Sequence, residues 1–196
     1  MKHAVKNICV YCASSSKVDA CYSEAAYTLG TLLGKENITL ITGGGCQGLM
    51  RNVEDGAMDS GGKAVGVIPQ FMVEQGWQYD RLSELRITSD MHERKQTMAA
   101  LADAIIALPG GCGTMEELFE IITWKQLGLY FNPIIILNTN GYYDHLIAQL
   151  EHAIDEHFMG KIHGTIWSVA TTPEEALRLA QETPLFDCTI RKYAAL

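Results

Sequence analysis

The sequence has little positive charge and no long hydrophobic run. Its 15 lysines and arginines are outnumbered by 23 aspartates and glutamates, which gives a formal net charge of −8 at pH 7. A general nucleic-acid binder needs a basic face to neutralise phosphates, so no nucleic-acid partner is expected. No run approaches the roughly 20 apolar residues of a membrane span, so no membrane partner is expected. The first residues also lack the apolar stretch of a signal peptide, which predicts a cytoplasmic protein.

Metal-binding and redox motifs are also missing. The six cysteines are scattered, and the C-x-x-C pair of Cys9 and Cys12 falls within a predicted strand, without the helix N-terminus that a redox motif uses. No second pair follows at zinc spacing, and His92-Glu93 lacks the second histidine of H-E-x-x-H. We therefore expect free thiols, no metal site and no cofactor. Cys112 is the one cysteine expected to be exposed.

Two nucleotide-binding motifs are absent as well. The first strand-like run is not followed by G-x-G-x-x-G, and no glycine turn ends in the Lys-Ser/Thr of a Walker A loop. Hydride transfer and NTP hydrolysis are therefore poorly supported. The chain has only five prolines and is 47% hydrophobic, which is typical of an ordered globular protein. Its 196 residues suit one domain, predicted to span residues 1–196.

What is present is an alternation of strand-like and helical patterns along the whole chain. Apolar runs predict strands at Ile8–Cys12, Ile38–Thr42, Ala64–Ile68, Ala104–Leu108, Ile134–Leu137 and Thr165–Val169. Helical periodicity lies between them, at Ala20–Lys35, Cys46–Ser60, His92–Ala102, Met115–Leu127, Tyr142–Glu156 and Pro173–Glu182. This order predicts an α/β fold with a Rossmann-like, doubly wound, mainly parallel sheet flanked by helices. Residues 69–88 break the rhythm, and we expect a surface excursion that borders the site or a subunit contact, with a weak strand near Leu85–Ile87.

The most informative segment is P-G-G-C-G-T-M-E-E at residues 109–117. It joins a buried strand to a helix, and its glycines let the backbone approach a ligand closely. The unpaired N–H groups and positive dipole end of the helix suit a phosphate. Glu117 would then place a carboxylate beside whatever carries that phosphate. Alternatively, such a turn serves only to pack the helix against the sheet.

Two further segments follow other strands or open helices. The turn T-G-G-G-C-Q-G-L-M at residues 42–50 either wraps a phosphate or ribose, or packs a helix closely against a strand. The segment M-H-E-R-K at residues 91–95 opens a helix, with Asp90 as the N-cap. Its two cations are disfavoured there by the helix dipole, which indicates an anionic partner. The alternative for this segment is a solvated charged face.

Together these segments resemble the Lonely Guy (LOG) family of cytokinin-activating nucleoside 5′-monophosphate phosphoribohydrolases, many of them formerly labelled lysine decarboxylases. The shared motifs are P-G-G-x-G-T-x-x-E, G-G-G-x-x-G-L-M and M-H-x-R-K, and the resemblance covers the chain to about residue 180. It includes V-Y-C-A-S-S at 10–15, T-W-K-Q-L-G at 123–128, and L-N at 137–138 with G-Y-Y at 141–143. Cys112 is a departure, since family members often carry tyrosine there; the phosphate turn is otherwise intact.

The resemblance implies hydrolysis of the N-glycosidic bond of a purine nucleoside 5′-monophosphate, either AMP or a cytokinin type, to free base and ribose 5-phosphate. It implies Arg94 and Glu117 as the catalytic pair, and a homodimer or larger homo-oligomer. The substrate-binding residues that it implies are Gly110, Gly111, Gly113 and Thr114 in the phosphate turn, Ser14, Gly44, Gly45 and Lys95 around the phosphoribosyl group, and Met91 on the base side.

The chemistry supports these roles independently. Breaking the bond builds positive charge on the ribose ring, which a nearby carboxylate such as Glu117 stabilises. Arg94 either holds the phosphate or assists the leaving base. Glu116 is expected to point elsewhere, since adjacent helical residues diverge by about 100°. The alternative function is a non-catalytic binding protein for a nucleotide or a molybdenum-type cofactor on the same fold, which would need the glycines but not the Arg94–Glu117 pair.

Overall fold

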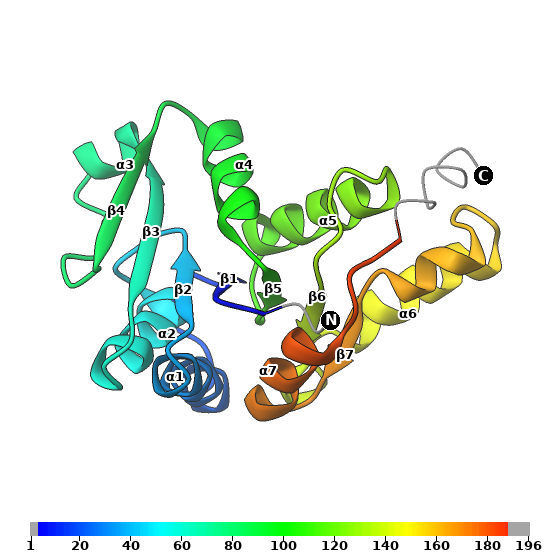
Figure 1. Ribbon diagram of the computed structural model, residues 1–196, viewed down its shortest axis with the longest axis horizontal. Helices are drawn as coiled ribbons and strands as arrows, with labels where there is room; N and C mark the ends of the chain where they lie inside the picture. Colours follow the sequence, from blue (N-terminus) through cyan, green and yellow to red (C-terminus); the bar gives the residue numbers. More distant parts are fainter. Residues whose placement is uncertain (1–3, 188–196) are drawn as a thin grey trace.

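The computed structural model describes residues 4–187, which form one seven-stranded sheet and its covering helices (Figure 1). Met1–His3 and Cys188, which entered the predictions above, lie outside the described residues. The strands are β1 (Asn7–Tyr11), β2 (Thr39–Thr42), β3 (Ala64–Pro69), β4 (Glu84–Thr88), β5 (Ala104–Ala107), β6 (Ile134–Leu137) and β7 (Ser168–Ala170). The α-helices are α1 (Ala20–Lys35), α2 (Gly48–Asp59), α3 (Gln70–Glu74), α4 (Met91–Leu101), α5 (Cys112–Gln126), α6 (Asp144–Asp155) and α7 (Pro173–Glu182). No helix within these residues is long and apolar enough to cross a membrane.

The sheet is parallel throughout, in the order β4-β3-β2-β1-β5-β6-β7. The chain starts in the middle, winds outward through β2, β3 and β4, and returns to pair β5 with the free side of β1. The predicted doubly wound α/β fold is confirmed. The winding reverses between β1 and β5, and ligands of open α/β sheets bind at the carboxyl ends of strands at such a reversal.

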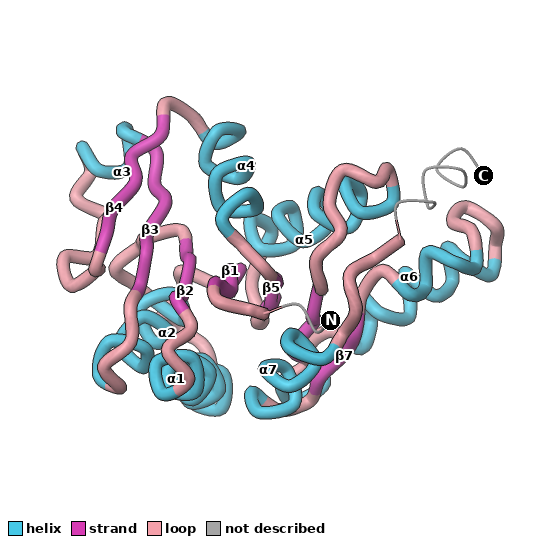
Figure 2. Tube along the Cα trace, in the orientation of Figure 1, coloured by secondary structure: helices cyan, strands magenta, loops and turns pink. Residues whose placement is uncertain are grey.

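Helices cover both faces of the sheet (Figure 2). One apolar cluster joins alternate strand residues to α1, α2 and α7, and the other joins the intervening residues to α4, α5 and α6. Cys9 belongs to one cluster and Cys12 to the other. The two thiols therefore lie on opposite faces of the sheet, which confirms that the C-x-x-C sequence is not a redox pair.

Two glycines let α1 and α2 pack with their backbones in contact. A Cβ built on Gly30 would lie 2.0 Å from the carbonyl oxygen of Val53, and one on Gly56 would lie 2.2 Å from that of Tyr27. Only glycine fits a backbone approach this close. The contact fixes α2 against α1, and α2 follows the second glycine turn.

The main differences from the predicted elements are at three places, and other element ends shift by one or two residues. The last strand begins at Ser168, because residues 161–165 form a 3₁₀ turn. Helix α5 begins at Cys112 rather than Met115, so part of the glycine turn belongs to the first turn of the helix. The excursion at 69–88 contains the short helix α3, and its weak strand is the complete edge strand β4, paired with β3.

Candidate active site

Three turns, at the carboxyl ends of β1, β2 and β5, surround a cleft of about 730 Å³. They are tied together through the main chain. The N–H of Ala13 donates to the carbonyl of Pro109 (3.3 Å), and the N–H of Met50 donates to the carbonyl of Ala13 (3.2 Å). Of the residues predicted for the site, those that border the cleft are Ser14, Gly45, Met91, Arg94, Gly111, Gly113, Thr114 and Glu117. Gly44, Lys95 and Gly110 do not line it.

The N-terminus of α5 opens onto this cleft. Gly111 is the N-cap residue and no side chain caps the helix, so N–H groups of the first turn remain for a ligand. A Cβ on Gly111 or Gly113 would meet nothing within 4 Å, whereas one on Gly110 would lie 2.1 Å from Oγ1 of Thr114. Gly110 therefore permits close packing, and the other two face the open cleft. This helix end suits an anion such as a phosphate.

Two consecutive tyrosines hold this turn from the far side of β5. The hydroxyl of Tyr142 donates to the carbonyl of Gly110, and that of Tyr143 donates to the carbonyl of Leu108, both at 2.7 Å. The N–H of Tyr143 donates to Oδ1 of Asn138 (2.6 Å). The G-Y-Y segment of the sequence thus fixes the backbone that leads into α5.

Arg94 and Glu117 form a buried ion pair at the edge of the cleft. Nη1 of Arg94 donates to Oε1 of Glu117 at 2.8 Å, and Nε donates to the carbonyl of Val67 at 3.0 Å. The two residues are 6% and 8% exposed. The pair joins α4 to α5, and Asp90 sets the start of α4 by accepting from the N–H of His92 and of Glu93. The prediction of Asp90 as the N-cap is confirmed.

Burial controls the charge of Glu117. Removal from water raises the pKa of its carboxyl, and the adjacent Arg94 guanidinium partly opposes that rise. Burial therefore favours the protonated carboxyl and Arg94 favours the carboxylate, which are the two states that an acid–base group must visit.

Lys95 lies next to Arg94 in the sequence but turns to a different partner. Its ammonium group bonds to the carboxylate of Glu116 and, at 3.1 Å, to Oε1 of Glu120. Both cations of the segment are buried, so the alternative of a solvated charged face is wrong. An anionic partner was expected for these two cations, and the structure supplies three glutamates of α5, namely Glu116, Glu117 and Glu120. Glu116 bonds to Lys95 rather than to Arg94, as expected, although it still borders the cleft.

The second glycine turn uses its main-chain groups internally. The N–H of Gly44 donates to the Thr42 hydroxyl at 3.0 Å, and the N–H of Gly45 lies 2.9 Å from the Met50 sulfur. Gly44 has a φ of 71°, which favours glycine. A Cβ on Gly43 would lie 1.9 Å from Nη2 of Arg94. This turn therefore makes room for the guanidinium and shapes the cleft wall.

Part of the cleft lining is apolar, and some of its residues lie in the excursion that was expected to border the site. Predicted Met91 borders it, and the others are Met50, Ile68, Met72 and Trp77. Met72 belongs to α3, and Trp77 lies just beyond it, so the excursion borders the site as expected. Trp77 is anchored because its carbonyl accepts from the N–H of Cys46 (2.9 Å). Met72 and Trp77 carried no periodic signal that could place them over the cleft.

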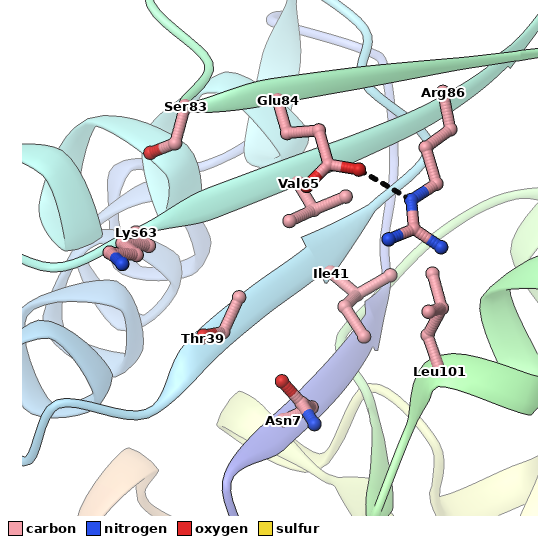
Figure 3. A pocket seen from close by; sticks show the side chains of 9 residues that line it. All are labelled: Asn7, Thr39, Ile41, Lys63, Val65, Ser83, Glu84, Arg86 and Leu101. Carbon is pink, nitrogen blue, oxygen red and sulfur yellow. Dashed lines mark hydrogen bonds and ion pairs between the residues drawn. The ribbon is translucent and has the colours of Figure 1, made fainter.

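A second hollow, of about 360 Å³, lies on the sheet at β2, β3 and β4, away from the glycine turns (Figure 3). Glu84 and Arg86, two residues apart on β4, form an ion pair along one side of it, with 2.6 Å between Nε and Oε1 (Figure 3). None of the predicted site residues borders this hollow. Within residues 4–187, no group of three or more His, Cys, Asp or Glu side chains could hold a metal ion.

Comparison with known proteins agrees with this geometry. The protein family described as possible lysine decarboxylase matches residues 50–180. The chain is 42% identical to the cytokinin riboside 5′-monophosphate phosphoribohydrolase LOG7 of Arabidopsis thaliana, over 95% of this chain and 86% of that protein. It is 41% identical to the phosphoribohydrolase LOG of Oryza sativa, over 93% and 76% of the two chains.

Solved structures share the fold at lower identity. The molybdenum cofactor binding protein of Rippkaea orientalis superposes with a TM-score of 0.67 at 23% identity, over 88% of this chain and 93% of that one. At that identity the likeness extends to the fold alone. The match to the plant proteins, in contrast, has about 40% identity and spans nearly the whole chain. The chain therefore belongs to the Lonely Guy (LOG) family, to which the possible lysine decarboxylase description also refers.

Proposed function

We propose that this protein hydrolyses the N-glycosidic bond of a purine nucleoside 5′-monophosphate, releasing the free base and ribose 5-phosphate. The observation that carries the proposal is the buried Arg94–Glu117 pair, which borders the same cleft as the uncapped N-terminus of α5. A phosphate site and a carboxylate on one helix suit a phosphorylated sugar. The names of the plant relatives, all phosphoribohydrolases, support the same reaction.

The substrate's phosphate would bind the N–H groups at the start of α5. Gly111 and Gly113 leave the space for it, and Thr114 and Ser14 supply hydroxyls at the border of the cleft. Glu117 lies one helical turn beyond Gly113, a rise of roughly 6 Å, which suits the distance from a 5′-phosphate to the ribose ring. Lys95 supports this region indirectly, since it holds Glu116 and Glu120 of the same helix.

In the reaction, the bond from C1′ to the base nitrogen breaks and its electron pair leaves with the base. Positive charge then builds on the ribose ring, where the Glu117 carboxylate stabilises it and accepts a proton from the attacking water. Arg94 holds Glu117 in place through a short ion pair and is itself held by the carbonyl of Val67. The departing base receives the proton that Glu117 took from the water, which restores the carboxylate, and it leaves toward the apolar part of the cleft. Binding energy from the remote phosphate fixes the sugar for attack, which favours monophosphates over nucleosides.

The apolar wall is the proposed site of the base. Met50, Met72, Met91 and Trp77 present thioether and aromatic surfaces that fit a flat purine. Methionine side chains adapt their shape to a ligand, so the same wall accommodates either AMP or an N6-prenylated AMP. The ratio of rates with these two substrates measures how far the wall favours a prenyl group.

The experiment is product analysis with the purified protein. AMP, N6-isopentenyl-AMP and adenosine are incubated separately, and free base and ribose 5-phosphate are quantified by chromatography. We expect base release from at least one monophosphate and at least about 100-fold less from adenosine, because the phosphate contributes to transition-state binding. Nucleotide binding without release of base would favour the alternative, a non-catalytic carrier. Nothing beyond the shared fold supports that alternative, because the structures named for molybdenum cofactor binding are less than 25% identical.

The remaining proposals concern organisation. We propose that residues 1–196 act as one nucleotide-binding domain in the cytoplasm, and that the protein is a homodimer or a larger homo-oligomer. The single sheet formed by all strands of the described residues supports the first. Exposed apolar side chains on and just after α5, at Phe119, Leu127 and Leu129, support self-association. Light scattering after size-exclusion chromatography measures the oligomer size.

A further inference from the structure

Glu54 is a buried acid that the proposed hydrolysis does not use. It lies on α2, is 0% exposed, and its Oε2 has no hydrogen-bond partner within the described residues. Burial raises the pKa of its carboxyl to about 8; the hydrogen bond from Thr42 opposes that rise, and the neighbouring Asp55 adds to it. Burial raises the pKa of the Cys12 thiol at the end of β1, and the nearby Glu54 carboxyl adds to that rise. An acid buried at this cost calls for an explanation.

Its one hydrogen bond leads to the second glycine turn. The Thr42 hydroxyl donates to Oε1 of Glu54 and accepts from the N–H of Gly44 at 3.0 Å. Thr42 is itself fully buried at the end of β2. Through these two bonds the carboxyl of α2 holds Gly44 in its left-handed conformation, with φ of 71°. Gly43 and Gly45, on either side of Gly44, border the cleft.

The same turn holds the wall that carries Trp77. The carbonyl of Gly44 accepts from the N–H of Tyr79 (2.9 Å), and the N–H of Cys46 donates to the carbonyl of Trp77 (2.9 Å). The Tyr79 hydroxyl returns to α2, where it bonds to the carboxylate of Asp55. Glu54 and Asp55, which are consecutive on α2, therefore support the two segments: Glu54 holds the glycine turn through Thr42, and Asp55 holds the Trp77 segment through Tyr79.

We infer that Glu54 is a positioning residue for substrate binding: through the Thr42 hydroxyl it fixes the Gly43–Gly45 turn, and with it the Trp77 wall of the cleft. The inference deepens the proposed function and rests on it for the kinetic readouts. Glu117 and Arg94 belong to α5 and α4, and the hydrogen bonds of Arg94 go to Glu117 and Val67 rather than to Glu54, Thr42 or Gly44. Losing the relay should therefore weaken binding and spare the chemical step.

The expected effects follow from which bond each variant removes. Glu54→Ala leaves the Thr42 hydroxyl without its acceptor, and Thr42→Val removes the hydroxyl itself. Each should raise KM for the nucleotide about fivefold, the effect of losing one buried hydrogen bond of about 1 kcal/mol, with kcat within about threefold. Glu54→Gln keeps an oxygen that can accept the same bond, so its KM should stay close to the wild-type value. The double variant Glu54→Ala/Thr42→Val should be no worse than either single variant.

Thr31→Val is the matched control, because it makes the same change at a buried hydroxyl of α1 that has no hydrogen-bond partner among residues 4–187. Amide hydrogen exchange measured by NMR gives a readout that does not depend on turnover. We expect faster exchange at Gly44 in Glu54→Ala and Thr42→Val than in Thr31→Val and Glu54→Gln. Dissociation constants for AMP complete the set.

The outcomes separate this inference from the proposed function. If the wild-type protein releases no base, the proposed function fails, while AMP affinity and exchange at Gly44 still test the relay. Wild-type affinity and wild-type Gly44 exchange in Glu54→Ala would overturn the inference. It would also be overturned if Glu54→Gln were as impaired as Glu54→Ala, or if Thr31→Val raised KM as much as Thr42→Val.

Discussion

Arg94 and Glu117 meet 2.8 Å apart between α4 and α5, although 23 residues separate them in the sequence. Both side chains are almost completely buried, so each needs the other to offset its removal from water. The guanidinium has a further contact to the carbonyl of Val67 on β3. These two hydrogen bonds hold the pair in one geometry, and a fixed geometry is what a group that stabilises a developing charge requires.

The first prediction concerns the Glu117 carboxylate. Glu117→Gln keeps the size of the side chain and removes its charge, so kcat should fall roughly 100-fold or more. Nucleotide affinity should change little, because the proposed phosphate site is the helix end. The measurement is steady-state base release together with AMP binding by calorimetry. Glu120→Gln, which alters a partner of Lys95 outside the cleft, is the control, and equal losses in both variants would refute the assigned role.

The second prediction uses the open space at Gly113. Alanine fits there without contact and is a better helix former, so Gly113→Ala should leave thermal stability unchanged or higher. Its methyl group would occupy the proposed phosphate position, and KM should rise about tenfold or more. Gly110→Ala should instead lower the melting temperature, since its Cβ would collide with Thr114. Unaltered KM in Gly113→Ala would place the phosphate elsewhere.

The third prediction tests why position 43 is glycine. A Cβ there would lie 1.9 Å from Nη2 of Arg94, so Gly43→Ala should displace the guanidinium from Glu117. We expect kcat/KM to fall at least about tenfold, the effect of one lost charged hydrogen bond. Arg94→Lys also breaks this arrangement, because an ammonium cannot form the same fork. In the double variant the two losses should be far from additive; simple additivity would mean that Gly43 acts independently of Arg94.

The fourth prediction concerns stability and pH. The pKa of the Glu54 carboxyl is about 8 in the folded protein and 4.5 in its ordinary state. Between these values the folded protein keeps a proton that the unfolded chain has lost. The free energy of unfolding should therefore fall by about 1.4 kcal/mol per pH unit from this group as pH rises. Glu54→Gln cannot titrate, so it lacks this loss. In urea unfolding from pH 5 to 9, the free energy of unfolding of Glu54→Gln minus that of wild type should increase up to about pH 8. Parallel curves for the two proteins would contradict the shift.

The sequence predicted the fold well because its strands are short apolar runs between helical patterns. β6, for example, reads Ile-Ile-Ile-Leu and is buried throughout. The last strand was predicted three residues too early, because Thr165, Ile166 and Trp167 are β-branched or aromatic like a strand, whereas the 3₁₀ turn of residues 161–165 takes up its first residue. Nothing local distinguishes the two, and only pairing with β6 decides the register.

The cleft residues that directly follow a strand could be predicted from the sequence. Ser14, Gly111 and Gly113 follow β1 and β5, and parallel strands end at one edge. Trp77 could be placed only within an excursion expected to border the site, since its exact position depends on a long-range main-chain bond to Cys46. Glu54 had a signal that was overlooked: it lies four residues after Met50 on the apolar stripe of α2, where a charge is costly. Lys95 follows Arg94 directly on a helix, and adjacent helical side chains point in different directions. The two cations therefore contact different partners.

The last prediction compares the two tyrosines that hold the phosphate turn. Both hydroxyls donate to main-chain carbonyls at 2.7 Å, but Tyr143 is buried and Tyr142 is exposed. Tyr143→Phe removes a hydrogen bond in the dry interior and should cost about 1–3 kcal/mol of stability. In Tyr142→Phe, water can replace the lost donor at Gly110, so stability should hold while a looser turn raises KM a few-fold. Thermal unfolding and base-release kinetics on both variants test this contrast. The reverse pattern, with Tyr142 governing stability, would mean that the exposed bond rather than the buried one fixes the turn.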